Sequence, residues 1–124
     1  MSLPIKISIG DVLLNAELND SSTAAAIAEA LPIEGAGNRW GEEIYFVTTV
    51  HHDGEPNARA EMDVGELAYW PPGKAFCIFF GPTPASESDE PRAASPCNPI
   101  GRITGNCKAL TNVSDSAPVR IEVA

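Results

Sequence analysis

Residues 4–18 read PIKISIGDVLLNAEL, and this stretch decides the fold class. Every second residue from Ile5 to Ile9 is isoleucine, and after Gly10-Asp11 every second residue is again apolar. Period-two alternation on both sides of a turn-forming pair is the pattern of a β-hairpin. The sequence therefore predicts two antiparallel strands at the start of the chain.

A short helix is expected next. Residues 19–22 (NDSS) offer side-chain acceptors for the first N–H groups of a helix. Apolar residues follow at helical spacing from Ala24 to Leu31, and Pro32 should end the helix. Residues 32–38 are so rich in glycine that we expect no regular structure there.

The remaining predicted elements are short. Residues 75–80 (AFCIFF) are an unbroken apolar run, as in a strand that is buried on both faces. Other strands are expected at residues 44–50, 66–70, 100–104 and 119–123, a helical turn or short helix at 108–113, a polar loop at 51–57, and a long proline-rich loop at 82–99. Several short strands with one clear helix favour an antiparallel barrel or sandwich, and the length suits one domain over residues 1–124.

Composition excludes several classes of protein. Seventeen acidic and eight basic residues give a formal charge of −9, which repels nucleic acid. No apolar stretch approaches the roughly 20 residues that a membrane span needs, and residues 1–10 do not resemble a secretory signal, so we expect a cytoplasmic protein without membrane contact. Cys77, Cys97 and Cys107 lack CxxC spacing and are expected to be reduced thiols, with a Cys97–Cys107 disulfide left open.

The most suggestive cluster is RWGEE at residues 39–43. An arginine, an indole and two carboxylates at the start of a strand can bind a polar ligand at the rim of a sheet. The alternative is structural, with Trp40 capping the core and Arg39 paired with a nearby acid. Alternation places Tyr45 on the same side as Glu43, opposite Ile44. Residues 79–84 (FFGPTP) form a stiff turn that can hold Thr83 at a pocket edge or merely change the direction of the chain.

Common catalytic and cofactor motifs are missing from the sequence. His51 and His52 are adjacent, and no second cluster completes a metal site around them. There is no GxSxG, GxGxxG or GxxxxGK[ST] segment. We therefore expect neither a cofactor nor a bound metal.

Three segments together resemble an uncharacterised prokaryotic family of cyclophilin-like proteins. They are NRWGEEIYF at residues 38–46, GELAYWPPGKAFCIFFGPTP at 65–84, and ASPCNPIGRITG at 94–105. The resemblance implies a mostly β fold, a closed cyclophilin-like barrel of about eight strands with one or two short helices. Prolyl isomerases of the cyclophilin type carry an Arg-Phe pair before a Gln-Gly-Gly-Asp segment, whereas here Arg39 precedes a tryptophan and the chain has no glutamine.

The resulting hypothesis is a non-catalytic domain that binds a small molecule or peptide. Its predicted pocket is bordered by Arg39, Trp40, Glu42, Tyr45, Phe80 and Thr83. Arg39 would clamp an anionic or carbonyl group, the aromatic rings would form flat walls, and Thr83 would supply a hydroxyl group. The alternatives are a divergent peptidyl-prolyl isomerase that uses Arg39, and an interaction module that pairs with itself, as a homo-oligomer, or with another protein.

Overall fold

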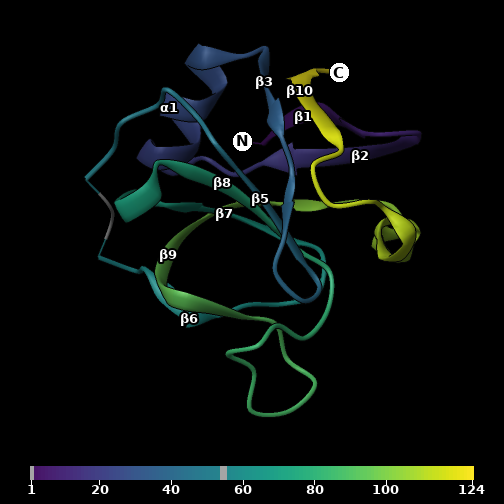
Figure 1. Cartoon of the computed structure of the whole chain (residues 1–124). Coiled ribbons are helices and arrows are strands. Elements are labelled where there is room, and N and C mark those ends of the chain that lie inside the picture. Colours follow the sequence, from purple (N-terminus) through teal and green to yellow (C-terminus); the bar gives the residue numbers. More distant parts are fainter. Residues whose placement is uncertain (1, 54–55) are drawn as a thin grey trace.

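The structure, a computed structural model, describes residues 2–53 and 56–124. Met1, Gly54 and Glu55 lie outside the described residues, and the last two belong to the loop predicted at 51–57. The described part of the chain forms a 10-stranded sheet, one α-helix and two 3-10 helices (Figure 1). In chain order the elements are β1 (Leu3–Ile9), β2 (Val12–Leu18), α1 (Ser22–Ala30), β3 (Ile33–Ala36), β4 (Asn38–Arg39), β5 (Glu43–Val47), β6 (Arg59–Glu61), β7 (Glu66–Trp70), η1 (Pro71–Gly73), β8 (Ala75–Phe79), β9 (Arg92–Ile103), η2 (Cys107–Asn112) and β10 (Pro118–Val123).

The sheet is antiparallel throughout the described residues, as the spacing of the strands predicts. Its strand order is β3-β10-β1-β2-β9-β7-β8-β5-β4, and β6 pairs separately with β9. The first and last strands of the chain, β1 and β10, are neighbours, with Ile7 opposite Ile121. No helix in the described part of the chain is long and apolar enough to cross a bilayer.

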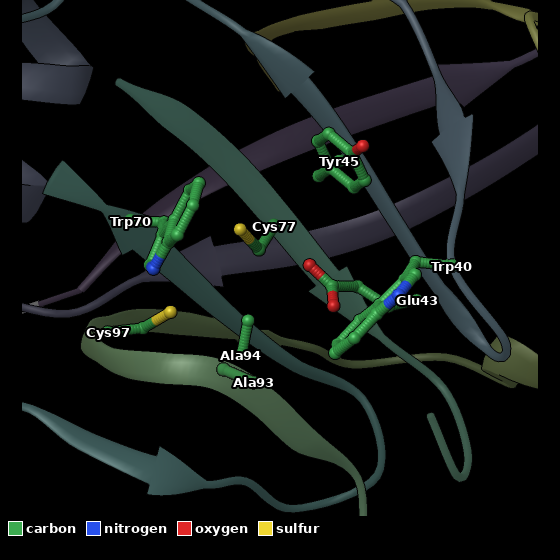
Figure 2. Close-up of a pocket in the computed structure, with 8 residues that line it drawn as sticks. All are labelled: Trp40, Glu43, Tyr45, Trp70, Cys77, Ala93, Ala94 and Cys97. Carbon is green, nitrogen blue, oxygen red and sulfur yellow. The ribbon is translucent and has the colours of Figure 1, made fainter. Parts of the chain in front are cut away.

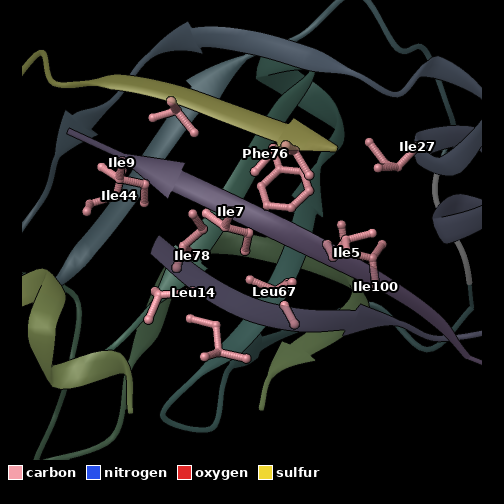
Figure 3. Close-up of a cluster of buried hydrophobic side chains, with 14 of the residues drawn as sticks. Ile5, Ile7, Ile9, Leu14, Ile27, Ile44, Leu67, Phe76, Ile78 and Ile100 are labelled. Atoms are coloured by element: carbon pink, nitrogen blue, oxygen red, sulfur yellow. The ribbon is translucent and has the colours of Figure 1, made fainter. Parts of the chain in front are cut away.

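The predicted hairpin is confirmed as β1 and β2. Ile5 pairs with Ala16 and Ile7 with Leu14, so the apolar positions of both strands point the same way. Ile5, Ile7 and Ile9 are fully buried, and they form much of the main core (Figure 3). The alternation that predicted the strands therefore also selects the buried face.

The predicted helix is confirmed as α1. The Ser21 side chain accepts a hydrogen bond from the Ala24 N–H at 3.1 Å, as an N-cap residue does. Leu31 has an extended backbone because the following Pro32 disfavours the helical conformation. The fully buried Ile27 anchors the helix to the main core.

The predicted closed barrel is wrong, because the sheet is open. The path of paired strands ends at β3 on one side and at β4 on the other, and no hydrogen-bonded ladder joins these two edges within the described residues. These edge strands are consecutive in the chain and are separated only by Gly37. They meet end to end, while closure of an antiparallel barrel needs two strands side by side.

The predicted loop at residues 32–38 is also wrong, since β3 and β4 occupy most of it. Gly35 lies against the ring of Phe46, where an added Cβ would come within 2.7 Å of a ring carbon. Glycine in this strand therefore permits close packing of the backbone on an aromatic ring. Its low strand propensity does not reveal this role, so the sequence predicts a loop.

The predicted loop at residues 82–99 is correct only in its first part. From Arg92 the chain belongs to β9, which continues to Ile103 and includes Pro96 and Pro99. Pro99 lies opposite Ala68 beside a shift in strand register, a place where a strand tolerates a residue without an N–H group. The other predicted strands lie within or overlap β5, β7, β8, β9 and β10, and the predicted helical turn is the 3-10 helix η2.

Two apolar clusters lie on opposite faces of the sheet. On β5, Ile44 and Phe46 point into the main core, while Tyr45 packs against the second cluster. On β8, Phe76 and Ile78 belong to the main core, and Ala75, Cys77 and Phe79 belong to the second cluster, so the prediction of a strand buried on both faces is confirmed. The second cluster forms the floor of the candidate site.

Candidate functional site

A cavity of about 250 Å³ opens on the second face of the sheet. Trp40 lies at the turn between β4 and β5, and Trp70 lies at the end of β7. Figure 2 shows Cys77 and the Glu43 carboxyl between these two indoles. The lining residues are Trp40, Glu43, Tyr45, Trp70, Cys77, Ala93, Ala94 and Cys97. The pocket is thus mainly aromatic and apolar, with one carboxyl group.

The turn between β4 and β5 holds Trp40 at the pocket. The Trp40 N–H donates to the Glu43 carbonyl at 3.0 Å, and the Glu43 N–H donates back to the Trp40 carbonyl at 3.2 Å. Gly41 has a φ of +63°, which suits glycine at the first central position of a tight turn. An added Cβ at Gly41 would lie 2.8 Å from the Cα of Thr83, so the turn packs closely on the chain after β8.

Trp70 is fixed on another side of the pocket. Its indole Nε1–H donates to the Ser95 hydroxyl at 2.7 Å, which ties the end of β7 to β9. Its ring lies against Gly73, where an added Cβ would be 2.9 Å from the ring carbons. The polar atom of this indole is therefore occupied, while the ring itself lines the cavity.

Glu43 is an acid buried without a cationic partner. Only 5% of the residue is exposed, and it forms no salt bridge within residues 2–53 and 56–124. Burial raises the pKa of its carboxyl group from 4.5 to about 7, and a hydrogen bond with the Cys77 thiol partly opposes this increase. The group therefore changes its charge near neutral pH.

The Cys77 thiol beside the carboxyl is a poor nucleophile. A hydrogen bond with Cys97, burial and the nearby Glu43 charge all raise the pKa of the Cys77 thiol, so it stays protonated. All three cysteines are free, and Cys107 lies in the main core, away from the second cluster that contains Cys97. Among the described residues, no group of three or more His, Cys, Asp or Glu side chains could hold a metal ion.

The structure brings two of the six predicted site residues, Trp40 and Tyr45, to the pocket. Arg39 points elsewhere, and its guanidinium donates to the carbonyls of Thr111 at 3.1 Å and Val113 at 2.9 Å, at the end of η2. The same group lies 5.1 Å from the ring centre of the fully buried Phe80. These contacts give Arg39 and Phe80 structural roles.

Glu42 and Thr83 do not line the pocket. The Phe80 N–H donates to the Glu42 carbonyl at 2.9 Å, and the Glu42 side chain lies over Gly81. The Thr83 hydroxyl donates to the Arg92 carbonyl and accepts from the Ala85 N–H at 3.2 Å. Glu42 thus ties the turn between β4 and β5 to the end of β8, and Thr83 ties the chain after β8 to the start of β9.

The pocket predicted from the sequence left out six of the lining residues, although Glu43 belongs to the RWGEE cluster. Glu43 carried a usable signal, because a charged residue shares its strand face with Tyr45 in an otherwise apolar β5. Trp70 stood out as an aromatic residue at the end of a strand. Nothing in the sequence placed Cys77, Cys97, Ala93 and Ala94 beside them, since that depends on which strands are neighbours in the sheet.

Comparison with known proteins places the chain in a family. The family model described as cyclophilin-like matches residues 3–122. The solution structure of the hypothetical protein AF2241 from Archaeoglobus fulgidus is 41% identical and superposes with a TM-score of 0.84, covering 99% of this chain and 95% of that chain. No protein with a curated description matches the chain. With a family match over nearly its whole length, the chain belongs to the cyclophilin-like family.

Proposed function

We propose that this protein binds a small molecule in the pocket between Trp40 and Trp70. The observation that carries the proposal is a preformed cavity with three aromatic side chains and a single buried carboxyl group in its lining. Binding sites for small molecules are mostly apolar cavities with a few well-placed polar groups. Trp40 and Tyr45 provide apolar walls here, as the sequence suggested, and Glu43 takes the polar role in place of Arg39.

The size of the cavity limits the ligand. Its volume of about 250 Å³ is slightly below the roughly 300–1,000 Å³ of pockets that take drug-sized ligands. A small metabolite, or one side chain of a peptide, would fill it. We favour a small molecule, because the described pocket is a compact cavity and includes no extended groove along a strand edge.

Binding without catalysis is the simpler form of the proposal. A protonated Cys77 thiol does not attack a substrate, and Arg39 already donates to backbone carbonyls. The alternative of prolyl isomerisation needs a donor free to hold a twisted amide, and the contacts of Arg39 do not favour it. Exchange spectroscopy on proline peptides, with Arg39→Ala as the variant, tests that alternative separately.

Tryptophan fluorescence provides a direct test. The chain has two tryptophans, and both line the pocket, so its intrinsic fluorescence reports on this site. We expect members of a small-metabolite library to change the fluorescence in a saturable way. The exposed Ala94 lies at the pocket, and Ala94→Phe should abolish the response by filling the space.

Ala109→Phe is the matched control, because Ala109 is exposed on η2 and does not line the pocket. It should leave the response unchanged. The proposal fails if no compound gives a saturable change, or if Ala94→Phe and Ala109→Phe behave alike.

A further inference from the structure

We propose that the ligand is an organic cation of the alkylammonium class, whose charged end inserts between the indoles and beside Glu43. This inference rests on the proposed function and specifies the chemistry of its ligand. It is carried by the juxtaposition, in one cavity, of aromatic side chains and a buried carboxyl group that has no cationic partner among the described residues.

The aromatic walls favour a cation. Trp40, Tyr45 and Trp70 contribute rings to the lining, and tryptophan is the aromatic residue that attracts cations most strongly. The indole N–H of Trp70 is already bonded to Ser95, so what that residue offers the cavity is ring surface. A group of aromatic rings around a small cavity is the arrangement that recognises quaternary and methylated ammonium groups.

Glu43 supplies the matching negative charge. Burying a carboxylate costs free energy. Glu43 is buried without a basic partner among the described residues, so folding has already removed most of its hydration before any ligand binds. A cation that enters the cavity gains the attraction of this charge in a site of low dielectric constant. An alkylated ammonium suits the site, because its carbon substituents can contact the apolar walls.

No basic side chain lines the pocket. The other titratable side chains that line the pocket are Tyr45 on β5, Cys77 on β8 and Cys97 on β9, and no lysine or arginine is among the lining residues. The whole chain carries a formal charge of −9, which draws cations toward its surface. Both the local and the global electrostatics therefore favour a cation over an anion.

The pH dependence distinguishes a cation from a neutral ligand. A cation prefers the ionised form of Glu43, so its binding should strengthen as the pH rises through about 7. A neutral hydrogen-bond acceptor prefers the protonated carboxyl, which donates, so its binding should weaken over the same interval. The two classes of ligand thus give opposite slopes.

The test compares choline with 3,3-dimethylbutan-1-ol, in which carbon replaces the nitrogen and the shape is kept. Tryptophan fluorescence titrations at about pH 6 and about pH 8 give the affinities. Choline should bind about tenfold more tightly at the higher pH, following the ionised fraction of Glu43, and more tightly than its neutral isostere at that pH. In Glu43→Gln the pH dependence should disappear, and the preference for choline should shrink to the part that the aromatic rings supply.

Control measurements separate the possible failures. Thermal unfolding checks that Glu43→Gln is folded. If it is not, two other results test the cation assignment: the change of choline affinity with pH in the native protein, and the loss of choline binding in Ala94→Phe. Equal affinity for both probes, tighter binding of the isostere, or no response to choline overturns the cation assignment. The metabolite screen tests whether the pocket binds any small molecule, and the choline titrations test whether that ligand is a cation. Failure of the first proposal is therefore distinguishable from failure of the second.

Discussion

At the scale of single residues, the buried Glu43 combines a cost to stability with the recognition role that we propose for it. Its position on β5 was visible in the sequence, since alternation puts it on the face of Tyr45. Its burial was not, because that depends on β8 and β9, which contribute Cys77 and Cys97. Sequence patterns place a residue on one face of its own strand, but not against the neighbours that cover it.

Glu43→Gln should change the pH dependence of stability. The carboxyl pKa is 4.5 ordinarily and about 7 in the folded protein, so the native state binds this proton more tightly than the unfolded state. The native protein therefore loses stability as the pH rises from 4.5 to about 7, and the amide variant is spared this loss. Relative to the native protein, the variant should gain roughly 3 kcal/mol across the interval.

Urea unfolding at both ends of that pH interval measures this difference. A difference between the two proteins that does not change with pH would show that Glu43 ionises normally.

Arg39→Ala should weaken the fold without removing a side chain that lines the pocket, although it also loses a hydrogen bond to the Gly41 carbonyl in the turn beside Trp40. The variant loses hydrogen bonds to the carbonyls of Thr111 and Val113 and the contact with the Phe80 ring. We expect a loss of about 2–3 kcal/mol in the free energy of unfolding. Arg120→Ala is the control, since Arg120 forms exposed ion pairs with Glu34 and Glu122 and should matter much less.

Ligand affinity provides the second measurement on Arg39→Ala. The ligand used is one whose binding is abolished by Ala94→Phe. If folded Arg39→Ala no longer binds it, Arg39 contacts the ligand, as the sequence suggests, and its contacts within the fold do not account for its whole role.

At the scale of elements, the turn between β4 and β5 connects the fold to the site. Gly41→Ala introduces a side chain at positive φ and against the Cα of Thr83, and it should destabilise the protein by about 1–3 kcal/mol. Because Trp40 flanks this glycine, tryptophan fluorescence should change as well. Gly105→Ala is the control, since an added Cβ there meets no atom within 4 Å. Equal urea midpoints for the two variants would contradict this role of the turn.

Several elements could be predicted because their signals are local. The β1–β2 hairpin follows from alternation around Gly10-Asp11, and α1 follows from its cap at Ser21 and from Pro32. The errors at β3 and β9 have a common cause, since glycine and proline usually interrupt strands. Gly35 instead makes room for Phe46, and Pro99 lies beside a register shift. Long-range packing decided both cases.

At the scale of the whole molecule, the family resemblance was correct, while the closed barrel inferred from it was not. Whether the edges of a sheet pair depends on the order and stagger of all its strands, and strand propensity carries no information about it. Here Gly37 joins the two edge strands end to end. The site depends on the same long-range order, because β7 lies between β8 and β9 and brings Trp70 beside Cys77 and Cys97.

The charge of the whole molecule has a measurable consequence for binding. With a formal charge of −9, the protein should bind choline less tightly as the salt concentration rises, because ions screen the attraction. Affinity for the neutral 3,3-dimethylbutan-1-ol should stay nearly constant in the same fluorescence titrations. A parallel response of both probes to salt would argue against electrostatic recognition.

The most direct test of the pocket as a ligand site is a fragment screen followed by ¹H–¹⁵N NMR on the native protein. Bound fragments should shift the indole N–H signals of Trp40 and Trp70 and the amide signals of Cys77 and Ala94, and these shifts should vanish in Ala94→Phe but persist in Ala109→Phe. Shifts that gather on another face of the sheet, or no saturable shifts at all, would contradict the assignment of this cavity as the binding site.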